Sequence, residues 1–195
     1  MPRTLKQQFA PEKVEEIHAL IRRIDRLSLP GGSSRYYAVE LSDCLQAGLL
    51  LASVHLAASL LELVVRGIVL ERAGSAFPSG PRNPSDLARG SLEHRMEEMR
   101  NLGFAKMVDH LVEVGLFDSE DGQLAKALYR TVRIPLHHGL VGRFVKQHDP
   151  IYNTLKELFG AFWPTTTSNN FEEVIEDNAL AILDTVVGIL ERNST

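Results

Sequence analysis

The chain has 195 residues, and its 44% hydrophobic and 24% charged content is that of an ordinary globular protein rather than a disordered one. A single cysteine, Cys44, excludes an internal disulfide and a cysteine-based zinc site, and it favours a reducing compartment such as the cytoplasm. The formal net charge of −4 argues against a protein that coats nucleic acid indiscriminately. The N-terminus shows no apolar core with a small-residue cleavage site, so no signal peptide is expected.

Residues 11–27 are predicted to form the first helix. Apolar residues recur there at spacings of three and four, with acids gathered at the beginning and arginines at the end, as the helix dipole favours. The segment 29–34, Leu-Pro-Gly-Gly-Ser-Ser, ends this helix and is predicted to be a linker. We therefore expect an N-terminal helix with its linker over residues 1–34, and a helical bundle over residues 35–195.

The most apolar part of the chain is predicted to be a helix from about Leu49 to Arg72. It follows a shorter predicted helix over residues 35–46. Two apolar rows at helical spacing bury most of its circumference, which places it at the centre of a bundle. Leu56, Leu60 and Leu63 are expected in the core.

One polar row interrupts this apolar helix. It consists of His55, Ser59, Glu62 and Arg66, at spacings of four, three and four. Glu62 and Arg66 can pair on a helix surface, and each charge near a bilayer centre costs about 2.5–3.5 kcal/mol. The segment is therefore interpreted as a core helix, with no membrane span. A row of this kind is more typical of a solvated stripe, and the alternative is that it forms a second wall of a functional cleft.

The rest of the chain is also helical in pattern, apart from its loops. Residues 74–91 are rich in proline and glycine and are predicted to form a long surface loop, a candidate partner-binding segment. Without any segment that alternates like a strand, the predicted fold is all-α, an up-and-down bundle of four to six helices. The further helices are expected around residues 92–99, 104–114, 119–133 and 151–159, and from 171 to the end.

The helix that precedes residue 133 has a clear start and a predicted stop. Asp118 and Ser119 supply the side chains that cap a helix N-terminus. Pro135 is expected to end the helix, because it lacks an amide donor and constrains the residue before it. The arginine in the last turn and the histidines after the proline are thereby expected to meet.

Charge is distributed unevenly along the chain. Residues 122–148 contain no Asp or Glu and five basic residues, whereas residues 171–192 hold six acids and one base. A basic island in an acidic chain suggests a localised anion site. Lys126, Arg130 and Arg133 are expected to share one helix face, exposed to solvent or lining a cleft, because their spacing is helical and no local acid neutralises them. The phosphate-binding candidates are Lys126, Arg130 and Arg143.

The segment Arg133-Ile-Pro-Leu-His-His-Gly places a fixed positive charge just before two titratable imidazoles. A guanidinium can bind phosphate and stabilise charge in a transition state, and histidine can exchange protons near neutral pH. The combination suits phosphodiester chemistry without a metal, and the other histidines show no metal-ligand spacing. The simpler alternative is a helix C-terminus, where arginine and histidine are favoured.

This segment resembles the Arg-x4-6-His motif of the HEPN superfamily of helical domains. The long early helix, with Gln46-Ala-Gly-Leu before it and Leu60-Leu-Glu-Leu within it, is similar to that family, as is the acidic last helix. The resemblance covers roughly residues 35–192. It implies a four- or five-helix bundle, often a two-fold homodimer in which the motifs of both subunits face one cleft, without a metal or another cofactor.

The resemblance also implies roles for single residues. Arg133 would bind the phosphate and His138 would act as acid and base, while Arg130 and His137 satisfy the looser spacing as secondary candidates. Active members are metal-independent endoribonucleases, many of them toxins or antiviral proteins; others only bind nucleotides or partner proteins. Ile134 departs from the pattern, because active members usually carry a polar residue, often Asn, directly after the arginine.

Three functions therefore stay open. The first is RNA binding at a homodimer cleft, with metal-independent cleavage of the toxin or defence type. The second is a non-catalytic module that binds a nucleotide or a protein partner such as an antitoxin. The third is a helical regulatory protein that binds its partner through residues 74–91.

Overall fold

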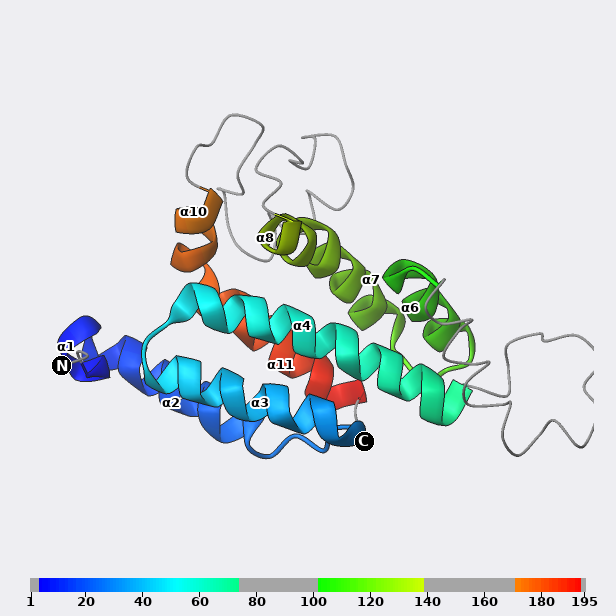
Figure 1. The fold of residues 1–195 in the computed structure, drawn as a ribbon, viewed down its shortest axis with the longest axis horizontal. Helices are drawn as coiled ribbons and strands as arrows, with labels where there is room; N and C mark the ends of the chain where they lie inside the picture. Colours follow the sequence, from blue (N-terminus) through cyan, green and yellow to red (C-terminus); the bar gives the residue numbers. More distant parts are fainter. Residues whose placement is uncertain (1–3, 74–101, 139–170, 194–195) are drawn as a thin grey trace, which may run out of the picture.

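The computed structural model describes residues 4–73, 102–138 and 171–193. Within these ranges the chain forms helices joined by turns, with no strand, so the fold of the described residues is all-α as predicted. Figure 1 shows the helices gathered around α4. In chain order, the helices and the two π-helical segments are α1 (Leu5–Gln8), α2 (Pro11–Ile24), α3 (Gly31–Gln46), α4 (Leu50–Ile68), η1 (Val69–Ala73), α6 (Phe104–Glu113), α7 (Ser119–Leu128), η3 (Tyr129–Arg133), α8 (Ile134–His138), α10 (Phe171–Asp177) and α11 (Ala179–Asn193).

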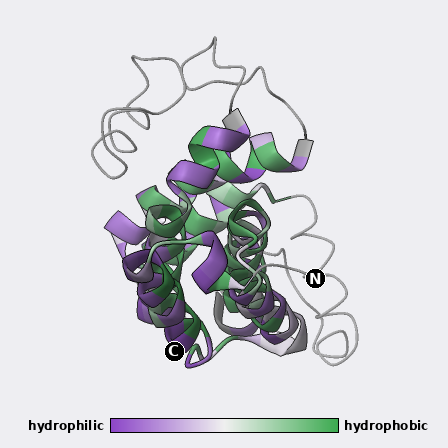
Figure 2. Cartoon of the chain, turned by 90° about the vertical axis from the view of Figure 1, so that its left-hand side faces the viewer, coloured by the Kyte–Doolittle hydropathy of each residue, from purple (hydrophilic) through white to green (hydrophobic). Residues whose placement is uncertain are grey.

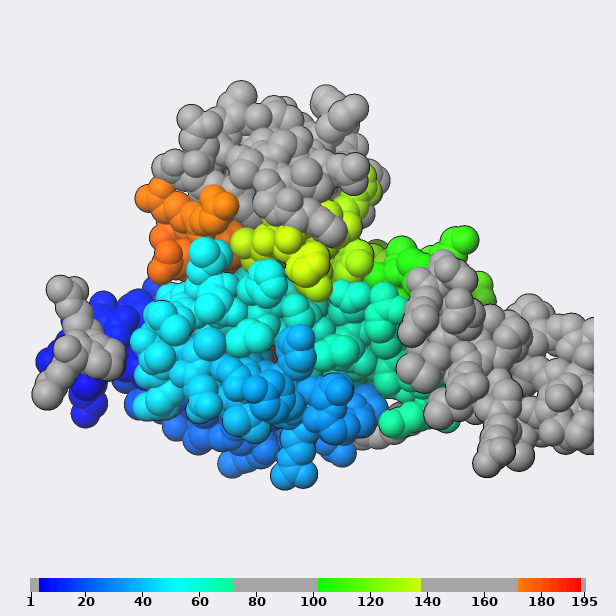
Figure 3. All heavy atoms as spheres, viewed as in Figure 1, coloured from blue at the N-terminus to red at the C-terminus, as the bar shows by residue number. Residues whose placement is uncertain are grey.

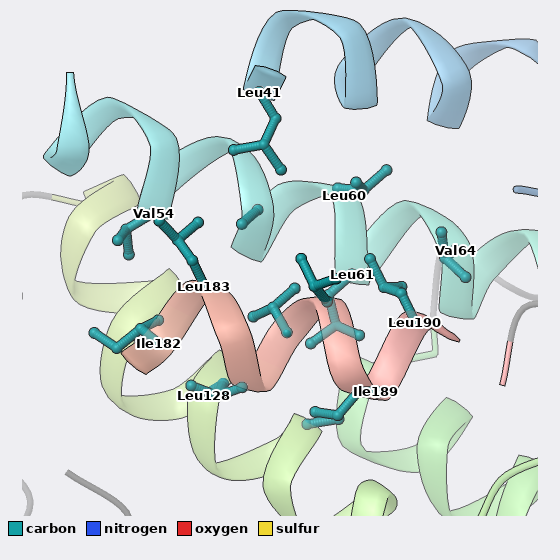
Figure 4. Packing of buried hydrophobic residues seen from close by; sticks show 14 of the residues in the cluster. Leu41, Val54, Leu60, Leu61, Val64, Leu128, Ile182, Leu183, Ile189 and Leu190 are labelled. Carbon is teal, nitrogen blue, oxygen red and sulfur yellow. The ribbon is translucent and has the colours of Figure 1, made fainter. Parts of the chain in front are cut away.

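The central position predicted for α4 is confirmed. It packs against α3, α6, α10, α11 and η3, and its apolar side chains meet those of α3, α7 and α11 in Figure 4. Of the three leucines expected in the core, Leu60 is fully buried, Leu56 is partly buried and packs against the core, and Leu63 is only partly buried. Periodicity identifies both apolar rows without showing which one faces the neighbouring helices. The row that is buried throughout consists of Leu50, Val54, Ala57, Leu61, Val64 and Ile68.

The segment Leu50–Glu71 is long enough and apolar enough to cross a membrane, judged by length and composition alone. In the fold, 56% of its most apolar window is buried inside the protein. Figure 2 shows apolar parts of the ribbon where helices face one another. A core helix has these same properties, so the interpretation of α4 as a core helix agrees with its packing.

The N-terminal helix α2 contributes to the same core as the rest of the bundle. Its buried Ile17 and Ile24 belong to one apolar cluster with residues of α3, α4 and α11. Arg23 donates hydrogen bonds to Asp184 and Glu191 of α11. Within the described residues, α2 therefore packs as part of the same bundle.

The predicted linker is also shorter than expected, because α3 begins at Gly31 rather than at residue 35. Pro30 is its N-cap in an extended conformation, and Gly31 follows with a φ of +72°, which a side chain would disfavour. Ser34 is buried against the bundle. Small residues thus serve here as a first helical turn, not as a flexible connection.

The predicted N-terminal cap of α7 is confirmed, whereas the predicted last helix has different boundaries. Asp118 Oδ1 accepts hydrogen bonds from the N–H groups of Glu120 at 2.8 Å and Asp121 at 3.3 Å. The predicted last helix is two helices, α10 and α11, which are separated at Asn178. The loop and helices predicted between 74 and 101 and between 139 and 170, with Arg143, lie outside the described residues.

Candidate functional site

Pro135 does not end the helix, contrary to prediction. The chain runs from α7 through the π-helical η3 into α8, and the N–H of Ile134 donates to the carbonyl of Tyr129, five residues earlier. Proline has no N–H to donate, and its ring clashes with the carbonyl four residues before it in a regular α-helix. A wider π turn directly precedes the proline here, and such turns frequently occur at functional sites.

The unbroken helix also changes which residues share a face. Lys126 and Arg130 line one pocket together with Ile134. The side chain of Arg133 faces α4 instead and is only 15% exposed. A π turn holds more residues than an α turn, so it rotates Arg133 away from the face of Lys126 and Arg130.

The prediction that no acid neutralises these cations is wrong as well. Lys126 Nζ lies 2.6 Å from Asp109 Oδ1 of α6. Arg133 Nε lies 3.5 Å from Glu62 Oε2 of α4. The segment around the motif lacks acids of its own, but neighbouring helices supply them.

The polar row of α4 lies opposite the motif, which agrees with the alternative that it is a second wall. Glu62 Oε1 accepts hydrogen bonds from Nε and Nη2 of Arg66 at 3.2 and 3.0 Å, while Glu62 Oε2 faces Arg133. One carboxylate therefore stands between two guanidinium groups. Ser59 turns inward and donates to the carbonyl of His55 at 2.9 Å. Figure 3 shows the segment that ends in α8 lying against α4 on the face turned to the viewer.

Arg133 is held in this wall with unused hydrogen-bond donors. Its Nε and Nη1 atoms are buried, and neither has a hydrogen-bond partner. The 3.5 Å approach to Glu62 is an ion pair rather than a hydrogen bond. A buried donor on a charged group without an acceptor costs about 1–3 kcal/mol or more, so proteins keep few of them.

Two histidine rings lie beside this guanidinium. The centroids of His55 and His137 are 6.0 Å apart, with the ring planes tilted by 45°. His137 follows Arg133 by four residues, which on a helix puts both on one face. Burial lowers the pKa of His55 below its ordinary value, and the positive charge of Arg133 and the proximity of His137 lower it further. This lowered pKa favours the neutral imidazole of His55.

The structure brings together two of the predicted residues, Arg133 and His137, and adds His55 to them. His137, the secondary candidate, lies at the site, while the side chain of the first choice, His138, lies outside the described part of the structure. Five residues along an α-helix correspond to a rotation of about 140°, so the backbone position of His138 is turned away from that of Arg133. Sequence reasoning placed His55 in a stripe of secondary interest. The signal that finds it is the spacing of its polar row on an otherwise apolar helix.

The residues that the structure describes contain no group of three or more His, Cys, Asp or Glu side chains arranged to hold a metal ion. No protein-family model, no curated protein sequence and no solved structure matches the chain. The resemblance to HEPN domains therefore stays a prediction that depends on the motif and the order of the helices.

Proposed function

We propose that the cluster of Arg133, His137 and His55 binds a phosphodiester, and that the protein is an HEPN-like RNA-binding domain that cleaves RNA without a metal. The observation that carries the proposal is the buried guanidinium of Arg133, whose Nε and Nη1 have no acceptor, beside two histidine rings 6.0 Å apart. A phosphate oxygen is the acceptor that a guanidinium matches best.

The two histidines differ in burial, and they are assigned opposite roles. His55 is half-buried and has a lowered pKa, so it is neutral and can take the proton from a ribose 2′-hydroxyl. The exposed His137 is placed to give a proton to the leaving 5′-oxygen.

The reaction is a transesterification followed by release of the two ends. The 2′-oxygen bonds to phosphorus as its proton passes to His55, and the bond from phosphorus to the 5′-oxygen breaks as His137 donates a proton. The products are a 2′,3′-cyclic phosphate and a 5′-hydroxyl end. Arg133 would stabilise the negative charge that builds on the phosphoryl oxygens.

A second candidate is anion or partner binding without cleavage, and Glu62 is the observation that favours it. Its carboxylate lies 3.5 Å from Arg133 and repels a phosphate that approaches the same guanidinium. Ile134 also lacks the polar group that active HEPN members carry next to the arginine. In this function the domain would bind a nucleotide or a protein such as an antitoxin. A cytoplasmic homodimer is proposed for both candidates.

The test is incubation of the full chain with mixed RNA in EDTA, with Arg133→Ala, His137→Ala and His138→Ala beside the unchanged protein. General acid–base catalysis contributes roughly 10²–10⁴-fold, so His137→Ala is expected to reduce cleavage by at least a hundredfold and to leave most RNA binding intact. Arg133→Ala is expected to weaken both. His138→Ala is the matched control, one residue away on the same helix, and is expected to cleave normally.

Three other results would change the assignment. Loss of cleavage in His138→Ala alone would return the catalytic role to His138. Undiminished cleavage in a combined Arg133→Ala and His137→Ala protein would exclude this site. RNA binding by the unchanged protein without any cleavage would select the second candidate.

A further inference from the structure

A pocket lies on the side of the η3 helix that carries Lys126 and Arg130. Its volume is about 660 Å³, within the range of roughly 300–1,000 Å³ that holds small-molecule ligands. The start of α6, with its N-cap Gly103 and with Phe104, forms one wall together with Asp109, and α7 and η3 form the other. Arg133 and the two histidine rings of the proposed cleavage site are not among the residues that line it.

The apolar part of the pocket is aromatic. The rings of Phe104 and Tyr129 stack with centroids 4.3 Å apart and planes inclined by 14°. Phe104 is buried and Tyr129 half-buried, so the stack is fixed by the core on one side and reaches the pocket on the other. Ala127 and Ile134 add aliphatic surface. A flat, weakly polar group such as a nucleobase suits these surroundings because stacking accepts any base.

The polar part of the pocket carries two cations, Lys126 and Arg130, and one acid, Asp109. Lys126 and Arg130 stand four residues apart on one helix face, and both line it. The N-terminus of α6 opens there with Gly103 as its N-cap, no side-chain cap and no acid in the first turn. The N–H groups of a first helical turn favour an anion, and the two cations reinforce that preference. Asp109 pairs with Lys126 at 2.6 Å, so a bound anion would share this lysine with it.

We propose that this pocket binds one nucleotide unit, with its base against the Phe104–Tyr129 stack and its phosphate towards Lys126, Arg130 and the start of α6. If that nucleotide unit belongs to an RNA strand, this proposal rests on the proposed function. Tyr129 borders both sites, because its phenol also lies within electrostatic reach of Glu62 and Arg133. A nucleotide bound here would then stand beside the phosphate at Arg133 and set the base preference of cleavage.

The direct test is calorimetric titration of the full chain with AMP, GMP, CMP and UMP, and with inorganic phosphate. Ala105→Trp fills the pocket from an exposed position of α6, and Ala181→Trp on an exposed position of α11 is the matched control. Ala105→Trp is expected to weaken the best mononucleotide at least tenfold, with no change in Ala181→Trp. A combined Lys126→Gln and Arg130→Gln protein is expected to bind about fivefold or more weakly and with a smaller salt dependence.

The outcome for the pocket can be separated from the outcome for cleavage. His137→Ala is expected to leave mononucleotide affinity unchanged while cleavage is lost. If the unchanged protein cleaves no RNA but binds a mononucleotide that Ala105→Trp weakens, the proposed function is wrong and the pocket is supported. Equal affinities in Ala105→Trp and Ala181→Trp, or inorganic phosphate bound as tightly as the nucleotides, would overturn the pocket whether or not RNA is cleaved. If Ala105→Trp changes the base preference of cleavage, the nucleotide unit that the pocket binds belongs to an RNA strand. If the base preference is unchanged, the pocket binds a free nucleotide.

Discussion

Arg192 and Arg133 each face a carboxylate from another helix, and they differ in how fully they are hydrogen-bonded. Arg192 donates from Nε and Nη2 to the two oxygens of Asp121 at 2.9 and 2.6 Å, and Asn193 adds a third bond at 2.6 Å. Arg133 is the more buried of the two, with 15% exposure against 58%, yet its ion pair with Glu62 is 3.5 Å long. Its buried Nε and Nη1 have no acceptor.

This difference in hydrogen bonding distinguishes a structural contact, at Arg192, from a candidate binding site, at Arg133. The cluster around Asp121 ties α7 to α11 and uses the hydrogen-bonding capacity of its carboxylate within the protein. The cluster around Arg133 keeps donors unused where burial makes them costly, and folds keep such groups mainly where a ligand or a reaction needs them. The first cluster should therefore matter for stability and the second for binding.

The largest expected effect is on folding and concerns Asp121. Asp121→Ala is expected to reduce the free energy of unfolding by roughly 2–4 kcal/mol, because it leaves the side chain of Asn193 and part of Arg192 without an acceptor. Arg133→Met removes unpaired donors and keeps most of the volume, so it is expected to change that free energy by less than about 1 kcal/mol. Urea unfolding followed by circular dichroism measures both.

Acid should reproduce the effect of Asp121→Ala in the unchanged protein. Burial alone raises the pKa of Asp121, but the hydrogen bonds from Arg192 and Asn193 outweigh it and lower the pKa overall. The stabilisation is therefore complete above the ordinary Asp pKa of about 3.9 and is lost as the pH falls through the lower folded value. A larger stability loss in Arg133→Met than in Asp121→Ala would reverse the assignment of the two clusters.

An intermediate effect is expected for Glu62, whose charge opposes a bound phosphate. Glu62→Gln is expected to tighten RNA binding about three- to tenfold, which corresponds to roughly 0.7–1.4 kcal/mol, and most strongly at low salt. Glu176→Gln, an exposed change of the same charge on α10, is the control for the altered net charge. Weaker binding in Glu62→Gln alone would mean that Glu62 holds Arg133 in its binding position and does not compete with the anion.

The smallest effect is on the titration of His55, which NMR of its ring protons can follow. The pKa is expected to lie below the ordinary value of about 6.5 and to rise when phosphate or RNA binds, because a bound anion offsets the charge of Arg133. Arg133→Met is expected to raise it for the same reason. Because the folded pKa is lowered, protonation of His55 costs folding free energy as the pH falls below 6.5. A pKa that no anion moves would place His55 outside the binding site.

The sequence by itself determined the features that depend on neighbours within one or two turns. The apolar period identified α4 as a central helix, and the capping side chain of Asp118 located the start of α7. The cluster of basic residues without local acids likewise pointed to the segment in which Arg133 and His137 lie. Helix caps and apolar periodicity depend on residues close in sequence, so they can be predicted from the sequence alone.

Only the tertiary structure decided which groups meet. Pro135 ends a helix by local rules, but the π turn at η3 carries the chain past it and rotates Arg133 towards α4. Glu62 pairs with Arg133, and His55 lies beside His137, although the partners are far apart in the sequence. No periodicity or motif spacing predicts such pairs. Ion pairs and proton-transfer partners depend on separations of a few ångströms between different helices, and these distances are set by packing of the whole core.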